Sequence, residues 1–302
     1  MRPPSSQPSG YRSQAYALAL ADVGQPLTFG STGGFLLERS IPGTQKQDLM
    51  GPYPLFCCDD WGVLGAALDA LGPRHVSVTL VTDPFCPIMA EGLADLFPIC
   101  RPLHDHFVID LAAPLTLSRH HRRKLRHAGS LRLASGPAEV SLAADWVRLY
   151  EVLVARKNIR DLRGFSAEAL RSQLQVPGAH LVTAWDNEEM VGADLYLLDG
   201  EVAYAHLSAY SDKGYDLSAS YPMMELAIGY FRDRGARFID LGGAPAAGNS
   251  GLLDFKSGWT HLTLPSYLCG RVLDPVAYRD LCPSGADGSG YFPGYRRGEF
   301  KT

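Results

Sequence analysis

The sequence contains no long hydrophobic run. None of its apolar stretches approaches the ~20 residues that a membrane-spanning helix needs. Residues 1–10 are rich in Pro and Ser and lack the basic-then-apolar order of a secretory signal peptide. We therefore expect a cytoplasmic protein without a membrane span, in which residues 1–20 form a disordered leader.

The sequence also lacks the spacing of a metal or disulfide site. Its six cysteines include no Cys-x-x-Cys pair, and His104-Asp105-His106 alternates as in a strand without a convincing third ligand. We therefore predict no metal site and no tightly bound cofactor. The net charge of −4 argues against a protein that coats nucleic acid, but it leaves room for a local basic patch.

The length and patterning indicate two α/β domains or one duplicated fold. The chain has 302 residues, whereas a typical domain has roughly 100–150. In the first half, apolar residues at helical spacing alternate with Val-rich extended runs. These patterns predict helices at residues 61–71 and 89–97 and strands at 75–82 and 106–111, which is an α/β order.

Residues 117–128 are the most basic segment of the chain. Ser118 can begin a helix there and Gly129 can end it. Its basic residues can contact several phosphates, as in tRNA: they are Arg119, Arg122, Arg123, Lys124 and Arg126. A solvated helix paired with acidic neighbours is the alternative. Two further helices are predicted at residues 145–157 and 166–174, the second capped by Ser166.

The second half contains three extended runs at residues 179–185, 190–198 and 201–211, separated by Asp-, Asn- and Gly-containing turns. They predict a meander of antiparallel strands. A helix at 221–234, with Ser220 as its cap, and a strand at 237–241 follow. This order resembles the central part of a GNAT domain.

Three motifs carry a wider resemblance: Gly235 to Gly243, Gly251 to Trp259, and the basic run Arg122 to Ala128. Together they resemble the Fem-type family over residues 45–280. The resemblance implies an α/β (α+β) fold with tandem GNAT-like domains, each a mixed, mainly antiparallel central sheet flanked by helices. We place these domains at residues 21–128 and 129–282, followed by a Gly-rich and aromatic tail at 283–302.

The resemblance implies an acyltransferase that forms an amide on an amine. Characterised Fem-type members take an amino acid from aminoacyl-tRNA, while many relatives are called N-acetyltransferases. Lys256 matches the lysine that contacts the donor's terminal nucleotide and the oxyanion of the transition state. Phe255 can stack on an adenine, and we assign Gly242 and Gly243 to the same donor end.

The strand at residues 201–211 alternates small apolar residues with residues that can form hydrogen bonds. Its polar face predicts the floor of the substrate cleft, with His206 as a base, Tyr210 as a second catalytic residue, and Tyr204 and Ser208 near the acceptor. Asp194 and Tyr196 join this face only if the turn at Asp199-Gly200 has an odd number of residues. A structural histidine in the core is the alternative for His206. Arg156 and Arg160 are candidates for holding an anionic acceptor.

The segment Lys213 to Tyr221 stands where enzymes that use acetyl-CoA carry a Gly-x-Gly pyrophosphate loop. It has a single glycine and an added Asp216, which disfavours ordinary CoA binding. We assign donor-pocket roles to four of its residues: Tyr215, Ser218, Ser220 and Tyr221.

These observations favour transfer from aminoacyl-tRNA to a small-molecule or peptide amine. An acyl-CoA-dependent N-acyltransferase is the first alternative, and a non-catalytic GNAT-like binding domain is the second. The aromatic and basic tail is predicted either to fold over the cleft or to be disordered.

Overall fold

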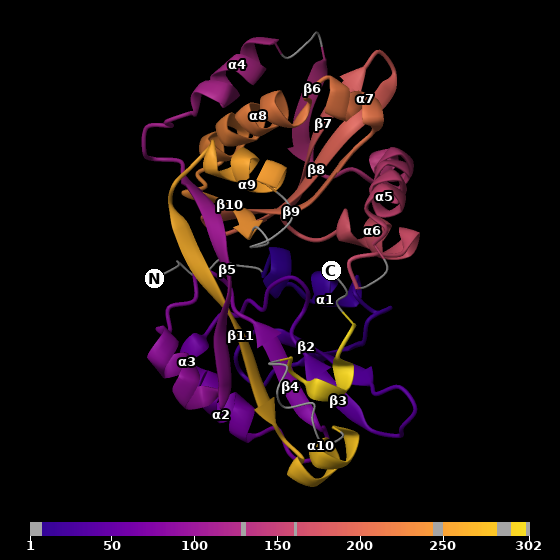
Figure 1. Cartoon of the computed structure of the whole chain (residues 1–302), viewed down its shortest axis with the longest axis vertical. Coiled ribbons are helices and arrows are strands. Elements are labelled where there is room, and N and C mark those ends of the chain that lie inside the picture. The colour runs from indigo at the N-terminus through magenta and orange to yellow at the C-terminus, as the bar shows by residue number, and fades with distance from the viewer. Residues whose placement is uncertain (1–7, 128–130, 160–161, 244–249, 283–290, 300–302) are drawn as a thin grey trace. The chain divides into compact units, whose positions relative to one another are not determined.

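The computed structural model describes residues 8–127, 131–159, 162–243, 250–282 and 291–299. They fall into two compact units (Figure 1). The central unit takes its residues from 1–10, 104–159 and 165–264, and the terminal unit takes its residues from 11–103, 160–164 and 265–302. This division differs from the predicted domain boundaries at residues 128 and 282. The reason is that two strands, β5 (Ile99–Asp110) and β11 (Thr263–Val272), each run from one unit into the other.

The terminal unit contains a sheet with the strand order β1-β2-β3-β4-β11. All neighbours are antiparallel except β3 and β4, which are parallel. Its strands before β11 are β1 (Gln25–Thr28), β2 (Phe35–Ser40), β3 (Gln47–Met50) and β4 (Ser77–Val81). Its helices are α1 (Gln14–Leu18), α2 (Leu64–Asp69), α3 (Ala90–Leu96) and α10 (Pro275–Leu281).

Part of the predicted disordered leader is ordered. Within residues 1–20, the structure forms helix α1, whose N-cap Ser13 accepts a hydrogen bond from the backbone N–H of Tyr16. Tyr16 and Ala17 have no exposed surface. Burial of this aromatic ring favours an ordered segment over a free leader.

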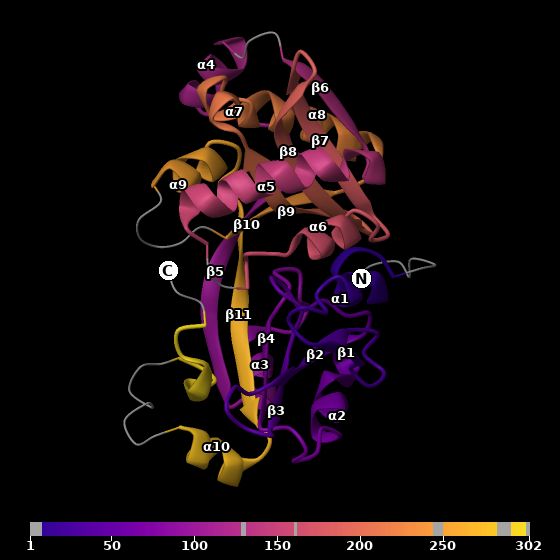
Figure 2. The ribbon, with the colours of Figure 1, turned by 90° about the vertical axis from the view of Figure 1, so that its right-hand side faces the viewer.

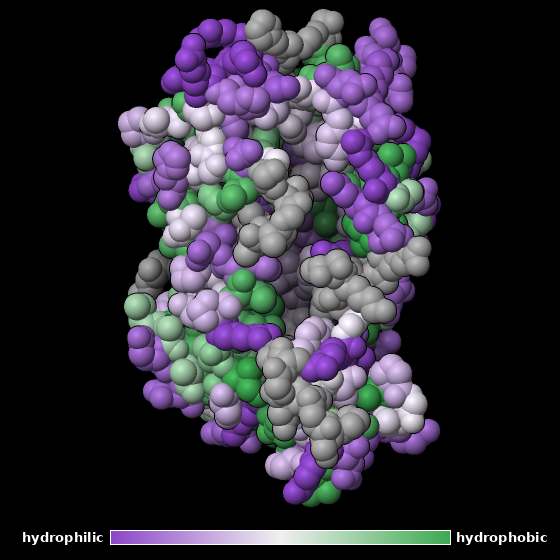
Figure 3. Space-filling view, viewed as in Figure 1, coloured by the Kyte–Doolittle hydropathy of each residue, from purple (hydrophilic) through white to green (hydrophobic). Residues whose placement is uncertain are grey.

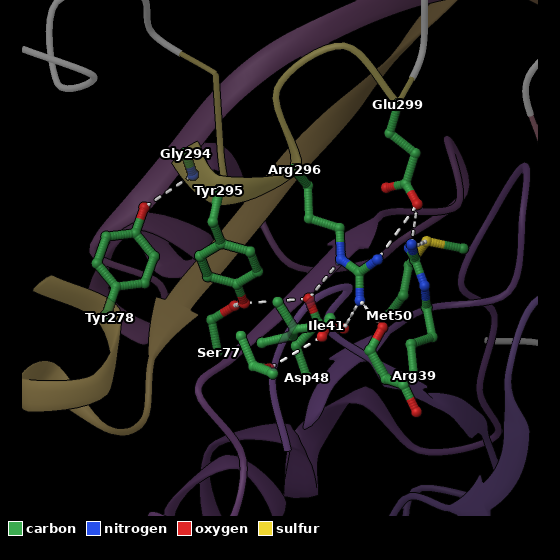
Figure 4. Close-up of polar contacts among 12 residues, drawn as sticks. Arg39, Ile41, Asp48, Met50, Ser77, Tyr278, Gly294, Tyr295, Arg296 and Glu299 are labelled. Atoms are coloured by element: carbon green, nitrogen blue, oxygen red, sulfur yellow. Dashed lines mark hydrogen bonds and ion pairs between the residues drawn. The ribbon is translucent and has the colours of Figure 1, made fainter. Parts of the chain in front are cut away.

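The described part of the C-terminal tail, residues 291–299, packs against the terminal unit's own sheet (Figure 4). Arg296 donates two hydrogen bonds of 2.8 Å to the two carboxylate oxygens of Asp48 on β3. The hydroxyl of Tyr295 donates to Asp48 at 3.0 Å, and Glu299 pairs with Arg39. These contacts contradict the prediction of disorder for residues 291–299, because they hold the cation and the phenol of this segment inside the terminal unit, and a cover over the substrate cleft stays a prediction.

The strands of the central unit have the order β5-β10-β9-β8-β7-β6. Only β9 and β10 are parallel neighbours in it. Beyond β5, its strands are β6 (Arg132–Pro137), β7 (Ala179–Asp186), β8 (Glu189–Asp199), β9 (Val202–Tyr210) and β10 (Phe238–Gly243). The mixed, mainly antiparallel sheet flanked by helices is therefore confirmed.

Helices cover both faces of this sheet (Figure 2). One face carries α5 (Ala143–Lys157) and α6 (Ala167–Gln173), and the other carries α8 (Ser220–Asp233) and α9 (Ser250–Ser257). The basic helix α4 (Arg119–His127) packs on α8, and the short α7 (Asp212–Asp216) follows β9. Among the described residues, no helix is both long enough and apolar enough to cross a membrane.

We expect Arg296→Met to lower the free energy of unfolding by roughly 3–5 kcal/mol, because it leaves the carboxylate of Asp48 buried without its partner. Arg271→Met is the control, since Arg271 and its partner Asp69 are 32% and 72% exposed. Its cost should stay below about 1 kcal/mol. Urea unfolding of both variants measures the difference, and equal costs would contradict a structural role for the tail.

Candidate active site

The central sheet opens between β9 and β10. These strands pair only over Phe238 to Asp240, and β10 then bulges against β5 before Gly243 pairs with His106. Gly242 lies within this bulge with a φ of 77°, a conformation that glycine adopts without steric cost. The C-terminal end of β10 is therefore free to meet side chains from β5 and α9.

Lys256 lies at this end of β10. Its ammonium group donates a 2.6 Å hydrogen bond to the carbonyl oxygen of Gly243, and the residue is only 8% exposed. Burial lowers the pKa of Lys256 to about 8, and the charge of Asp240 opposes that shift. The structure thus brings together three predicted donor-site residues, Lys256, Gly242 and Gly243.

Three further residues complete this group, and the sequence did not identify them as functional. The Nδ1 atom of His106 lies 3.1 and 2.9 Å from the two carboxylate oxygens of Asp240. His104 stands beside Gly243, where an added Cβ would lie 2.5 Å from that of His104. Burial lowers the pKa of His104, and the charges of His106 and Lys256 lower it further. We call His104, His106, Asp240, Gly242, Gly243 and Lys256 the Lys256 cluster.

The basic helix and the motif around Lys256 are joined by His121. In α4, His121 is 1% exposed, and its Nε2 lies 2.8 Å from the carbonyl oxygen of Phe255. Its ring also packs edge-on against Trp259, with centroids 5.1 Å apart. A Cβ at Gly258 would overlap this ring. Gly258 therefore admits the side chain that holds α4 against α9, and Ser118 caps α4 by accepting from the backbone N–H of His121.

The residues assigned to the donor pocket lie partly along the same contact. Lys124 donates a 3.0 Å hydrogen bond to Ser218, and His120 lies 3.2 Å from the hydroxyl of Tyr221. The rings of Tyr221 and Phe255 meet edge-on at 5.3 Å. Ser218, Tyr221 and Phe255 are therefore brought together beside α4.

Ser220 does not cap α8. It is the first residue of that helix, while Ala219 holds the N-cap position without a side-chain hydrogen bond. The preceding segment, at the place of the pyrophosphate loop in enzymes that use acetyl-CoA, includes α7. Ser211 caps α7 by accepting from the backbone N–H of Gly214. The expected loop is therefore partly helical.

A second polar group forms where β9 ends. The hydroxyl of Tyr210 donates a 2.6 Å hydrogen bond to Asp194, which is also hydrogen-bonded to Ser208. Burial raises the pKa of Asp194 to about 6, and both hydrogen bonds oppose that rise. The ring of Tyr215 lies 5.5 Å from that of Tyr210, and the guanidinium of Arg156 stacks over Tyr215 at 4.2 Å. The structure therefore brings these five predicted residues together.

His206 does not join this group, because a β-bulge interrupts the pairing of β8 and β9. Leu195 pairs with Leu207 but Tyr196 pairs with Ala205, so His206 is the extra residue. Its Nε2 lies 3.2 Å from the side-chain oxygen of Gln173 on α6. The prediction that Tyr204, His206, Ser208 and Tyr210 share one face is therefore wrong, and Asp194 orients Tyr210 rather than His206.

The surroundings of His206 and Tyr196 are those of core residues. Burial lowers the pKa of His206 to about 3, which makes it a weak base. Tyr196 has no exposed surface, and its ring packs 4.9 Å from that of Phe231. Tyr204 is 1% exposed. Arg156 donates to Asp212 at 2.6 Å, and the predicted Arg160 lies outside the described residues.

We expect Gly258→Ala to lower the free energy of unfolding by about 1–3 kcal/mol, because the new methyl group must displace the ring of His121. Gly251→Ala is a matched control in α9, where an added Cβ meets no atom within 4 Å. That change should be neutral or stabilise by about 0.5–1 kcal/mol. Chemical unfolding of both variants measures these effects, and equal stabilities would show that His121 does not need this glycine.

Comparisons with known proteins agree with this architecture. Residues 118–257 match the model of a family described as an acetyltransferase (GNAT) domain. No match was found among curated proteins. The crystal structure of FemX is similar at a TM-score of 0.65 and 15% identity, over 90% of this chain and 95% of that chain.

Two lysylphosphatidylglycerol synthetase structures are also similar. The C-terminal domain of a putative enzyme from Agrobacterium fabrum has a TM-score of 0.57 at 15% identity, over 88% of this chain and 89% of that one. L-PGS from Bacillus licheniformis has a TM-score of 0.54 at 13% identity, over 90% and 96%. The chain therefore has the predicted Fem-type GNAT fold, and its residues 118–257 are a GNAT acyltransferase domain.

Proposed function

We propose that this acyltransferase transfers an aminoacyl group from aminoacyl-tRNA to the amine of a small molecule or peptide. The observation that carries the proposal is the link through His121 between the exposed arginines of α4 and the Phe255-Lys256 segment. A polyanion bound along α4 would lie beside the segment to which we assign its reactive end. Aminoacyl-tRNA would then act as a co-substrate, and the reaction needs no tightly bound cofactor.

The charge distribution of α4 supports a polyanionic donor. Arg119, Arg122, Arg123 and Arg126 are exposed, and among the described residues no ion pair involves them. Together with His120 they line a surface hollow, and Figure 3 shows hydrophilic surface over this helix. Unpaired guanidinium groups on one helix suit several phosphates, because each neutralised phosphate releases condensed counterions.

The inward side of the same helix supports this arrangement. His121 and Leu125 are buried or half-buried, so α4 presents its arginines outward and its packing residues inward. Lys124 is held by Ser218, close to the first turn of α8. The predicted alternative, a solvated helix paired with acidic neighbours, does not account for this packed side of α4.

Lys256 supplies the group that an acyl transfer needs at its developing oxyanion. An ammonium fixed in a buried site stabilises negative charge more strongly than one in water. Its hydrogen bond to Gly243 holds the side chain in place before substrate binds. Phe255 is half-buried against Tyr221, which leaves part of its ring for a base of the donor.

The alternative donor is acyl-CoA, and the match of residues 118–257 to an acetyltransferase model is the observation in its favour. The segment before α8 argues against it. Enzymes that use CoA bind pyrophosphate with backbone amides of a glycine-rich loop, whereas this chain has α7 and then Ser218, whose hydroxyl accepts from Lys124.

Turnover with charged tRNA and with acetyl-CoA separates the two donors. We expect amide product from aminoacyl-tRNA, its loss after RNase treatment, and little product from acetyl-CoA. Replacing Arg122 and Arg123 by Ala should raise KM for tRNA by about tenfold. It should also reduce the slope of log affinity against log salt concentration by about one per lost phosphate contact.

The control for these arginines is the double replacement of Arg171 and Arg279 by Ala. Both side chains are exposed, and their replacement removes the same amount of charge. This control should leave KM for tRNA unchanged. Equal product from acetyl-CoA without RNA would overturn the tRNA donor and favour the alternative.

Lys256→Met is expected to lower kcat by about 10²–10³-fold, the typical loss when one oxyanion donor is removed. Because the pKa of Lys256 is lowered to about 8, the ammonium is present below that pH and wild-type activity should fall above it. Lys256→Arg keeps the charge and should lose this alkaline decline. Activity measured from pH 6 to 10 tests both expectations.

The stability of Lys256→Met is the control for folding. The lowered pKa of Lys256 means that its buried ammonium destabilises the folded state at pH 7, where the side chain is charged in both the folded and the unfolded protein. Replacement by methionine should therefore not lower the melting temperature. Lys46→Met, at a half-exposed lysine of the terminal unit, should leave kcat unchanged. Full activity of Lys256→Met would exclude the proposed role of Lys256 in stabilising the oxyanion.

A further inference from the structure

A histidine and a carboxylate of the Lys256 cluster have no role in the function proposed above. His106 on β5 is 6% exposed and Asp240 on β10 is 2% exposed. The Nδ1 atom of His106 faces both oxygens of Asp240 at 2.9 and 3.1 Å. This two-oxygen contact orients the imidazole ring and fixes which of its nitrogens faces away from the carboxylate.

Backbone geometry holds the carboxylate as well as the ring. Asp240 pairs across the sheet with Val108, and the bulge that follows lets Gly243 pair with His106. The backbone N–H of Gly242 donates a 2.8 Å hydrogen bond to Asp240. Asp240 therefore accepts from the turn that ends β10, so its position follows that of Gly242 and Gly243.

The pair shares this turn with Lys256. The carbonyl of Gly243 accepts from Lys256, and the charges of Asp240 and Lys256 interact. The ionisable groups around His106 are His104 and Asp105 on its own strand, Asp240 on β10 and Lys256 on α9. The imidazole of His106 and the ammonium of Lys256 thus both contact one short segment of the chain, Asp240 to Gly243.

The remaining ring nitrogen of His106 is neither paired with a described residue nor fully enclosed. Over the described residues, Nε2 of His106 has no hydrogen-bond partner, and it is not among the fully enclosed polar atoms without one. Those same residues also contain no three His, Cys, Asp or Glu side chains arranged to hold a metal ion. The arrangement suits proton transfer, in which a carboxylate keeps the proton on Nδ1 and leaves Nε2 as the base.

We propose that His106 is the general base of the acyl transfer and that Asp240 is its positioning residue. Nε2 accepts a proton as the neutral amine forms its bond to the carbonyl carbon, and Asp240 stabilises the resulting imidazolium. The bond from that carbon to the leaving atom, oxygen in an aminoacyl ester or sulfur in acyl-CoA, then breaks, and the proton passes from Nε2 to this atom. The products are the amide, the free hydroxyl or thiol, and the neutral imidazole. The inference rests on the proposed amide-forming function but not on the choice of donor.

A histidine beside a carboxylate is not by itself a catalytic group. His75 in the terminal unit is 2% exposed and lies 2.6 Å from Glu38, a pair of the same kind. The surroundings of the two histidines differ, because His106 pairs with Gly243, whose carbonyl accepts the hydrogen bond of Lys256. His75 therefore provides a matched control for the removal of a paired, buried histidine.

The test is His106→Asn, whose amide can still donate to Asp240 but cannot act as a base. We expect kcat to fall by about 10²-fold or more. The decline of wild-type activity at acidic pH, where the base is protonated, should disappear. His75→Asn should keep both kcat and the pH profile, and melting temperatures check that each variant is folded. Unchanged activity or an unchanged acidic limb in His106→Asn would overturn the proposal.

A second measurement does not depend on turnover. In the ¹⁵N spectrum of the histidine-labelled protein, neutral His106 should carry its proton on Nδ1, and Asp240→Asn should shift it toward the other tautomer. A proton on Nε2 in the wild type would overturn the role of His106 even if the enzyme is active. Failure with charged tRNA but activity with acetyl-CoA would overturn only the donor, because the pH profile is then measured with acetyl-CoA.

Discussion

The candidate site depends on the point at which hydrogen bonding between β9 and β10 stops. After Asp240 the two strands no longer pair, and β10 bends through Gly242 in a left-handed conformation. A fully paired β10 would use the carbonyl of Gly243 for the ladder, as obligatory backbone groups do. Its release lets that carbonyl accept from Lys256 and lets Asp240 face His106. One interruption of the sheet therefore assembles groups from β5, β10 and α9.

This assembly places charges where water is scarce, which costs free energy unless each charge has a partner. Asp240 has His106 and the N–H of Gly242 as partners, while Lys256 donates its hydrogen bond to a neutral carbonyl. That difference explains why burial lowers the pKa of Lys256 so far. A purely structural site would gain stability from an apolar residue here. Retaining the ammonium at such a cost is characteristic of a functional group.

Local patterns predicted most elements, because a helix or strand is specified by residues near one another in sequence. The meander of β7 to β9, the long helix α8 and the cap at Ser166 followed from periodicity and turn residues. The bulge at His206 did not, since a strict alternation conceals an extra residue, and Tyr204 and His206 were consequently placed on the face of Ser208 and Tyr210. The ordered tail also escaped prediction, because its anchor, Asp48, lies 248 residues from Arg296.

The two halves of the site, Lys256 and the pair of His106 with Asp240, were not equally recognisable from the sequence. Lys256 belongs to a contiguous motif, so a resemblance could point to it. The alternation of His104 and His106 was visible too, but it was interpreted as a strand without a third ligand, and Asp240 is 134 residues from His106. No spacing rule connects residues that far apart; only the antiparallel pairing of β5 with β10 does. Sequence patterns therefore miss residues whose chemistry depends on a partner across a sheet, even when each residue is identified as a polar position in a strand.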